Sequence, residues 1–172
     1  MEMFDQVMRG ATAAIPPEYF LLPIGGAPAR HRERVYCYEL YHQMRSLWPE
    51  RCEWFLNGEV DKGGHPLFVG EAAPKPDFLV HVPGQARNFA AIEVKSRALE
   101  KSGLRKDLRT LQRFKERGYQ RVILLVYGAE PGEAARRVLS CGAPPEHLAG
   151  IELWVHAQEG QGAEQVEVTA DG

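Results

Sequence analysis

Three charged residues, Asp77, Glu93 and Lys95, are of the right types and spacing to carry out chemistry. They lie in a stretch, 76–95, that is otherwise mostly apolar. Charged groups on buried strands cost free energy unless they are paired or bind an ion. Two carboxylates suit a hard divalent cation such as Mg²⁺, which takes oxygen ligands and keeps several waters. An amine beside them could stabilise an oxyanion or orient a water, and this combination is the chemistry of phosphodiester hydrolysis.

These residues fall at the ends of two predicted strands. Residues 77–82 and 89–95 are rich in apolar residues, and a polar turn that begins with Pro83 and Gly84 separates them. Strands joined by so short a turn pair antiparallel, so the start of the first lies beside the end of the second. The sequence therefore brings three charged side chains to one end of an apolar hairpin.

The register of this hairpin decides which side chains share a face of the sheet. Glu93 and Lys95 share one, because side chains alternate along a strand. In the simplest pairing across the turn, Asp77 falls beside Val94. A register slipped by one residue moves Asp77 to the face of Glu93 and Lys95, and both registers stay open at this point.

Asp77, preceded by a proline, and the run Glu93-Val94-Lys95 resemble the motif of the PD-(D/E)xK nuclease superfamily, also called restriction-endonuclease-like. With its flanking elements, the resemblance covers about residues 30–128. It implies that Asp77 and Glu93 bind Mg²⁺, for which Mn²⁺ can substitute, and that the backbone carbonyl of Val94 is a further ligand. It also implies that Lys95 assists the attacking water.

The resemblance implies two further candidates on neighbouring helices. Many members of the superfamily add a Glu on the helix before the motif, and Glu39 matches it here, although a solvent-facing Glu39 is the alternative. Some members carry a Gln on the helix after the motif. Gln112 is the match there, with an incomplete pattern around it.

A basic segment, 87–121, includes the second half of the motif. It holds 11 Lys and Arg against four acidic residues, a net charge of +7, whereas the remainder of the chain carries −9. A local basic face is what binding to a phosphate backbone requires, and the alternative is an ordinary solvated helix face. The residues expected to bind the nucleic-acid backbone are Arg97, Lys101, Arg105, Lys106 and Arg109.

Hydrophobic periodicity predicts the elements that position these residues. The predicted helices are 3–14, 31–48, 102–118 and 133–141, and the predicted strands are 53–56, 77–82, 89–95, 121–127, 151–156 and 165–169. The run 121–127 is apolar after Arg121, as in a strand covered on both faces. The strand, helix, strand order of residues 89–127 implies a crossover between parallel strands. We therefore expect an α/β fold with a mixed β-sheet flanked by helices on both faces, which is the restriction-endonuclease-like core that the resemblance implies.

The connections are predicted from turn residues. Residues 19–28, rich in Pro and Gly, are expected to form a loop packed on the domain, and Asn57-Gly58 is a hairpin turn signal. Residues 59–64 are expected to form a polar turn that lies close enough to the motif hairpin to line the site.

Length and composition fit one domain over residues 1–172, since the chain is long enough to bury a core and has 44% hydrophobic residues. No apolar run approaches the roughly 20 residues of a membrane span, and no secretory signal is visible at the N-terminus. The three cysteines are widely spaced and form neither a disulfide framework nor a zinc pattern. A reducing, cytoplasmic setting is expected.

The sequence thus predicts a Mg²⁺-dependent endonuclease or exonuclease that acts on nucleic acid, with DNA favoured over RNA. A homodimer or a larger nuclease complex is compatible with this prediction. One alternative is a non-cleaving nucleic-acid-binding or interaction module with a nuclease-like fold. Another is a structural protein in which the three charged residues simply pair.

Overall fold

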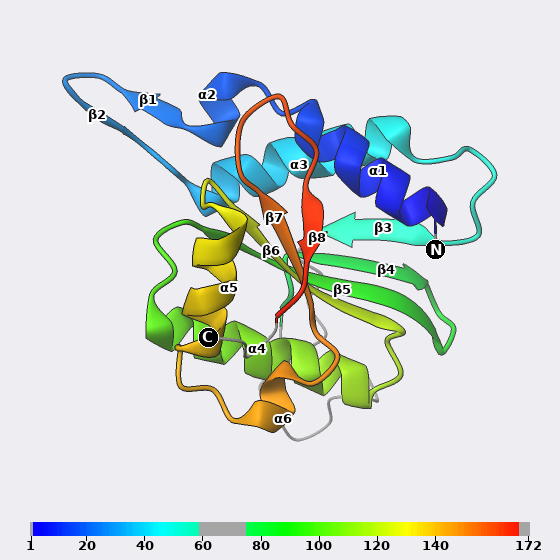
Figure 1. The fold of residues 1–172 in the computed structure, drawn as a ribbon. Helices are drawn as coiled ribbons and strands as arrows, with labels where there is room; N and C mark the ends of the chain where they lie inside the picture. Colours follow the sequence, from blue (N-terminus) through cyan, green and yellow to red (C-terminus); the bar gives the residue numbers. More distant parts are fainter. Residues whose placement is uncertain (1, 59–74, 169–172) are drawn as a thin grey trace.

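A six-stranded mixed sheet with helices on both of its faces forms the body of the molecule (Figure 1). The computed structural model describes residues 2–58 and 75–168. The helices are α1 Glu2–Ala13, α2 Pro17–Phe20, α3 Glu33–Leu47, α4 Lys101–Glu116, α5 Pro131–Leu139 and α6 Pro145–Leu148. The strands are β1 Leu22–Ile24, β2 Ala27–Arg30, β3 Phe55–Gly58, β4 Phe78–Val82, β5 Arg87–Ser96, β6 Arg121–Tyr127, β7 Glu152–His156 and β8 Glu164–Val166. The predicted α/β class, with its mixed sheet and two helical layers, is confirmed.

The strand order of the large sheet is β3-β4-β5-β6-β7-β8. The pairs β3–β4, β4–β5 and β7–β8 are antiparallel, whereas β5–β6 and β6–β7 are parallel. Helix α4 connects β5 to β6, so the predicted crossover between parallel strands is confirmed. All seven residues of β6 are buried, as expected for an apolar strand in the middle of a covered sheet.

Two separate clusters of apolar side chains pack on the two faces of the sheet. On one face Phe78, Ile92 and Val94 pack with residues of α1 and α3. On the other face, Leu79 and Ala91 pack with residues of α4 and α5. Because side chains alternate along a strand, Glu93 and Lys95, two and four residues after Ala91, belong to the α4 side.

The register between β4 and β5 changes by one residue within the hairpin. Phe78 lies opposite Ile92 and Val80 opposite Ala90, but the pairing shifts between Val80 and His81. Extending the Phe78 pairing by one residue places Asp77 opposite Glu93. Of the two registers left open by the sequence, the structure thus has the slipped one at Phe78, the last residue of β4 that pairs with β5 before Asp77.

Two predicted connections are wrong. Residues 19–28 are not a plain loop, because they contain part of α2 and the strands of the β1–β2 hairpin. Gly25 and Gly26, with Gly26 at a φ of +74°, form the tight turn that this hairpin needs. Asn57 and Gly58 are not a turn but the end of β3, where pairing with β4 keeps them extended. The predicted turn at 59–64 lies outside the described residues.

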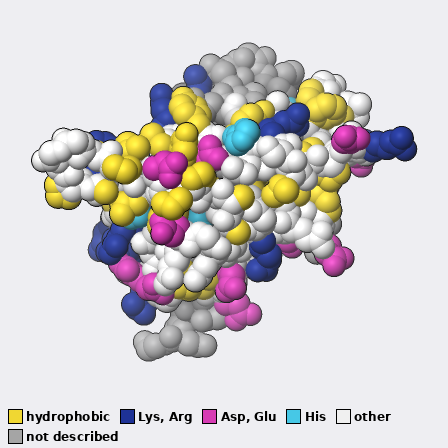
Figure 2. Space-filling view, turned by 90° about the horizontal axis from the view of Figure 1, so that it is seen from above, with side chains coloured by type: hydrophobic (Ala, Val, Ile, Leu, Met, Phe, Trp, Pro, Cys, Tyr) yellow, Lys and Arg dark blue, Asp and Glu magenta, His cyan; other side chains and the backbone are white. Residues whose placement is uncertain are grey.

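The β1–β2 hairpin projects from the body of the molecule (Figures 1 and 2), and all four residues of β2 are exposed. No helix in the described part of the chain is long and apolar enough to cross a membrane.

His31 anchors the base of this hairpin to the end of β6. Its Nδ1 lies 2.9 Å from the carbonyl oxygen of Phe20, and its ring centroid lies 5.3 Å from that of Tyr127. Gly128 follows with a φ of +76°, and a Cβ atom on it would lie 2.6 Å from Cε1 of His31. Gly128 is therefore required both by its left-handed backbone and by the close approach of an imidazole.

We expect Gly128→Ala to lower the free energy of unfolding by about 3 kcal/mol, from left-handed strain together with the clash against His31. Gly84→Ala is the matched control, because Gly84 has a φ of +74° and nothing within 4 Å of the added Cβ. It should cost only about 1 kcal/mol. Urea denaturation of both variants measures the difference, and equal losses would show that the His31 contact does not constrain position 128.

Candidate functional site

Asp77 occupies the position directly before β4, where the ladder to β5 stops. Its Oδ2 accepts a hydrogen bond of 2.7 Å from the backbone N–H of Val94. The carboxylate thus takes the place of a strand partner for β5. Because the N–H and C=O of one strand residue point to the same side of the strand, the carbonyl of Val94 also faces the edge that β4 leaves open.

Glu93 directly precedes Val94 on β5 and is only 7% exposed. Burial raises its pKa well above the ordinary value, and the negative charges of Asp77 and Asp107 raise it further. Burial likewise raises the pKa of Asp77 to about 6, although the Val94 hydrogen bond and the charge of Lys95 act in the opposite direction. The two carboxylates therefore lie close enough for their charges to interact, in surroundings that disfavour their ionised forms.

Lys95 pairs with two carboxylates from different helices. Its Nζ lies 3.0 Å from Oδ2 of Asp107 on α4 and 3.2 Å from Oε2 of Glu33 on α3. Burial alone would lower the pKa of Lys95, but the charges of Asp107 and Glu33 raise it above its ordinary value. The amine is accordingly an ammonium ion at neutral pH.

Glu33 has a second contact that fixes its position. Its Oε1 accepts hydrogen bonds from the backbone N–H and the hydroxyl of Ser96, both at 3.2 Å. One carboxylate at the start of α3 thus binds the end of β5 through Ser96 and Lys95 together. Asp107 is 6% exposed, and its burial raises its pKa even though Lys95 favours its ionised form.

The sequence did not single out Glu33 or Asp107. The α3 carboxylate expected at the site was Glu39, but its Oε1 accepts a hydrogen bond of 2.6 Å from Gln43, one turn further along the helix. Glu33, six residues earlier, is the α3 carboxylate that contacts Lys95. The signal was present, because Glu33 continues the buried stripe of Cys37, Leu40 and Met44 by one turn.

Asp107 likewise interrupts an apolar stripe. The buried residues of α4 include Leu104, Leu108 and Leu111, and Asp107 lies among them. A charged residue within an apolar helix stripe is a sign of a buried partner. Gln112, the other α4 candidate, is half-buried, and its Oε1 has no hydrogen-bond partner in the described structure.

The five predicted backbone-binding residues, Arg97, Lys101, Arg105, Lys106 and Arg109, are all exposed. They differ in their surroundings. Nη1 of Arg105 donates a hydrogen bond of 2.8 Å to the carbonyl of Cys141, which directs it toward the end of α5. The positive charge of Lys106 lies close enough to Glu93 and Asp107 to lower the pKa of both. Lys106 is therefore the basic residue of α4 that the structure places beside the acidic cluster.

Cys37 borders the same cluster from α3. Burial, together with the negative charges of Asp77 and Glu33, raises its pKa far above the ordinary value. The thiol stays protonated, so it is not a nucleophile at neutral pH.

In the part of the chain that the structure describes, no group of three or more His, Cys, Asp or Glu side chains is arranged to hold a metal ion. The arrangement can offer a cation two carboxylates, Asp77 and Glu93, and the carbonyl of Val94. Comparison with family models, with curated proteins and with solved structures finds no match to this chain.

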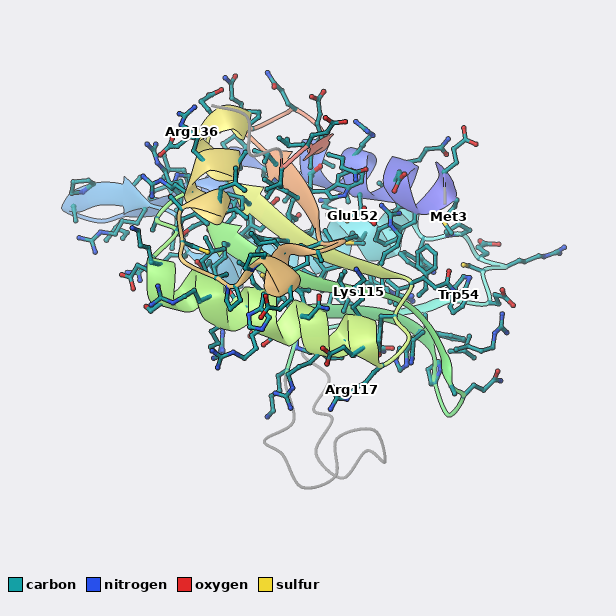
Figure 3. The ribbon with its side chains drawn as sticks, turned by 60° about the horizontal axis from the view of Figure 1, so that its bottom comes forward. Met3, Trp54, Lys115, Arg117, Arg136 and Glu152 are labelled. Atoms are coloured by element: carbon teal, nitrogen blue, oxygen red, sulfur yellow. The ribbon has the colours of Figure 1, made fainter. Side chains whose placement is uncertain are left out.

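The ion pair between Lys95 and Asp107 gives a stability prediction. Lys95→Met leaves Asp107 buried without a cation and should lower the free energy of unfolding by on the order of 2 kcal/mol, the partial exposure of Lys95 reducing the penalty. Adding Asp107→Leu should recover most of the loss, because the unpaired buried carboxylate of Asp107 is then removed. Lys115→Met is the control, since Lys115 lies elsewhere on α4 (Figure 3) and its Nζ bonds the carbonyl of Ala149. A double variant no more stable than Lys95→Met would contradict this pairing.

The raised pKa of Asp77 gives a pH prediction. In the metal-free protein, ionised Asp77 destabilises the fold above about pH 6, because its folded pKa of about 6 exceeds the unfolded value of about 4. Asp77→Asn keeps an oxygen for the Val94 N–H but carries no charge. It should be more stable than the parent protein by on the order of 1 kcal/mol above pH 6, and the difference should shrink as the pH falls from 6 to 4.

Measuring the difference between the two proteins removes the contribution of groups that do not interact with Asp77. Burial lowers the pKa of His156 to about 4, which makes both proteins less stable as the pH falls and cancels in the comparison. Denaturant titrations at half-unit pH steps provide the data. A difference that stays constant from pH 7.5 to pH 4 would contradict the raised pKa of Asp77.

Proposed function

We propose that this protein is a metal-dependent nuclease that hydrolyses phosphodiester bonds in nucleic acid, with DNA favoured over RNA. The observation that carries the proposal is that Asp77, bonded to the Val94 N–H where the ladder between β4 and β5 stops, lies close enough to Glu93 and Lys95 for their charges to interact. The order α3, three antiparallel strands, α4 and the parallel strand β6 also agrees with the PD-(D/E)xK core that the sequence resembles.

The residues at this edge fit a hard divalent cation. Oδ2 of Asp77 is engaged by the Val94 N–H, which leaves Oδ1 as a ligand beside the carboxylate of Glu93. Mg²⁺ keeps several waters, so two carboxylates and the Val94 carbonyl are sufficient protein ligands. The mutual repulsion of Asp77 and Glu93 would be relieved by a cation between them. Mg²⁺ bound there would supply Lewis-acid stabilisation of charge on the phosphoryl oxygens.

Lys95 would supply the fixed positive charge of the reaction. Its raised pKa keeps it protonated, so it would donate hydrogen bonds to an attacking water or to a phosphate oxygen and would not act as a base. Glu33 and Asp107 hold the ammonium group from two sides, which limits its freedom before substrate arrives. In this proposal Glu33 takes the helix position for which the sequence suggested Glu39.

Basic residues around the site would bind the nucleic-acid backbone. Lys106 is the best placed, since its charge reaches Glu93 and Asp107, and Arg97, Lys101 and Arg109 are exposed along the same segment. Each phosphate contact releases counterions, so affinity should fall steeply as salt rises.

A second candidate function is a non-cleaving nucleic-acid-binding or interaction module with the same fold. The observation that favours it is the ion pairing of Lys95 with Glu33 and Asp107, which gives the charges partners without any metal. In this case the cluster would be a structural link between α3, the sheet and α4.

One assay separates the two functions. Single-stranded and duplex DNA and RNA are incubated with the protein in Mg²⁺, Mn²⁺ or EDTA, and products are resolved by length. Cleavage should occur with Mg²⁺ or Mn²⁺ and stop in EDTA. Lys95→Gln keeps amide donors for Glu33 and Asp107 but removes the charge, so we expect at least a ~100-fold loss of cleavage rate with the fold intact.

Lys115→Gln, on the same helix but bonded to the Ala149 carbonyl, should cleave like the parent protein. Binding of Mg²⁺, followed as a rise in melting temperature, should persist in Lys95→Gln and be lost in Asp77→Asn. If the folded parent protein binds nucleic acid and cleaves none of the four substrates with either metal, the non-cleaving module is the correct reading.

A further inference from the structure

A hollow of about 330 Å³ opens beside Asp77, between α3 and the ends of β3 and β4. Its size is at the lower end of the range for small-ligand pockets. Aromatic side chains, Tyr38 and Tyr41 from α3 and Phe78 from β4, contribute to its lining. Asp77 is the one charged residue among its described lining residues.

The inner wall of the hollow is held in place by packing. The rings of Tyr41 and Phe78 are nearly parallel, with an interplanar angle of 7° and centroids 6.3 Å apart. Phe78 is 2% exposed, and the Tyr41 hydroxyl reaches the carbonyl of Leu56 at 3.5 Å. A ligand would therefore meet a preformed aromatic surface.

Tyr38 forms the outer wall of the hollow and, unlike Phe78, is largely exposed. It is 61% exposed, the largest exposed fraction among the large hydrophobic residues of the described structure. Within the described residues, no other ring packs against it. An exposed aromatic face at the mouth of an aromatic hollow is a surface on which a planar group can stack.

We propose that this hollow receives an unpaired nucleobase of the nucleic acid whose phosphate lies at Asp77 and Glu93. The inference rests on the proposed function and specifies its substrate class: a single strand, or a strand locally unstacked from its duplex. Asp77 connects the two places, because it lines the hollow while its Oδ2 faces Val94 at the acidic edge.

The chemistry of the lining favours a base over other parts of a nucleotide. A nucleobase is neutral and planar, and it stacks on tyrosine regardless of its identity. A phosphate is anionic, and the carboxylate of Asp77 with no basic residue in the described lining would repel it. In duplex nucleic acid the bases are stacked and paired, so filling the hollow would require a base to be extruded at a cost.

Fluorescence anisotropy tests the proposal without cleavage. Labelled 12-nucleotide single strands of DNA and of RNA, and the matching duplexes, are titrated with Lys95→Gln protein in Mg²⁺, so that the probes are not cut. Tyr38→Ala in this background should weaken single-strand binding by about 5- to 150-fold and leave duplex binding unchanged. Tyr38→Phe should bind like its parent, because the ring is kept. The DNA and RNA arms show which of the two supplies the base.

Tyr19→Ala is the matched control, because Tyr19 is an exposed aromatic residue on α2 outside the hollow. It should change no affinity. A second measurement locates the base: in a series of single strands with one abasic position each, the effect of Tyr38→Ala should vanish at one position only.

Three results would overturn the proposal. The first is equal affinity of Tyr38→Ala and its parent for every single strand, and the second is equal weakening of single strands and duplexes. If either occurs while the protein with Lys95 intact still cleaves, the nuclease proposal stands and the base-binding hollow is rejected. The third is a folded parent protein that neither binds nor cleaves nucleic acid, and this result removes both proposals together.

Discussion

The ammonium group of Lys95 joins three layers of the molecule at one point. It extends from the sheet and contacts Glu33 at the start of α3 and Asp107 in the middle of α4. These helices cover opposite faces, so their positions relative to each other are coupled through one cation. Burying such charges carries a desolvation penalty that only good pairing offsets. The additional bonds from Ser96 to Glu33 complete the pairing on the α3 side.

The cluster around Lys95 has more negative than positive groups. Lys95 is paired with Glu33 and Asp107, and Asp77 and Glu93 add two more carboxylates. The two cations that act on these groups, Lys95 and Lys106, cannot neutralise all four carboxylates. Burial is the main cause of the raised pKa values of Asp77 and Glu93, and neighbouring negative charges raise them further, so the folded protein holds protons that it would release more easily when unfolded. This imbalance is a property expected of a site that takes up a cation, and in a purely structural cluster it would be an uncompensated cost.

The parts of the fold and site that could be predicted are those set by local sequence. The apolar run 122–127 of β6 and the crossover from β5 followed from periodicity, and so did the placement of Glu93 and Lys95 on one face. The face of Asp77 did not, because a one-residue shift at Val80 decides it and no residue pattern marks that shift. Glu33 and Asp107 were missed because the resemblance directed attention to Glu39 and Gln112 on the same two helices, although Glu33 and Asp107 both lie in apolar stripes of these helices. The β1–β2 hairpin was missed because its prolines are poor strand formers.

Those same prolines have a consequence for the projecting hairpin. A two-stranded ribbon leaves backbone donors and acceptors on both outer edges, which is a template for pairing with another chain. Pro23 in β1 and Pro28 in β2 each lack an N–H, and Arg30 places a charge at the end of β2. A third strand that added to either edge would lack some backbone N–H donors to pair with, and it would lie beside a charged side chain at the end of β2. The hairpin can thus stand clear of the body as an isolated ribbon while resisting the edge-to-edge association that leads to aggregation.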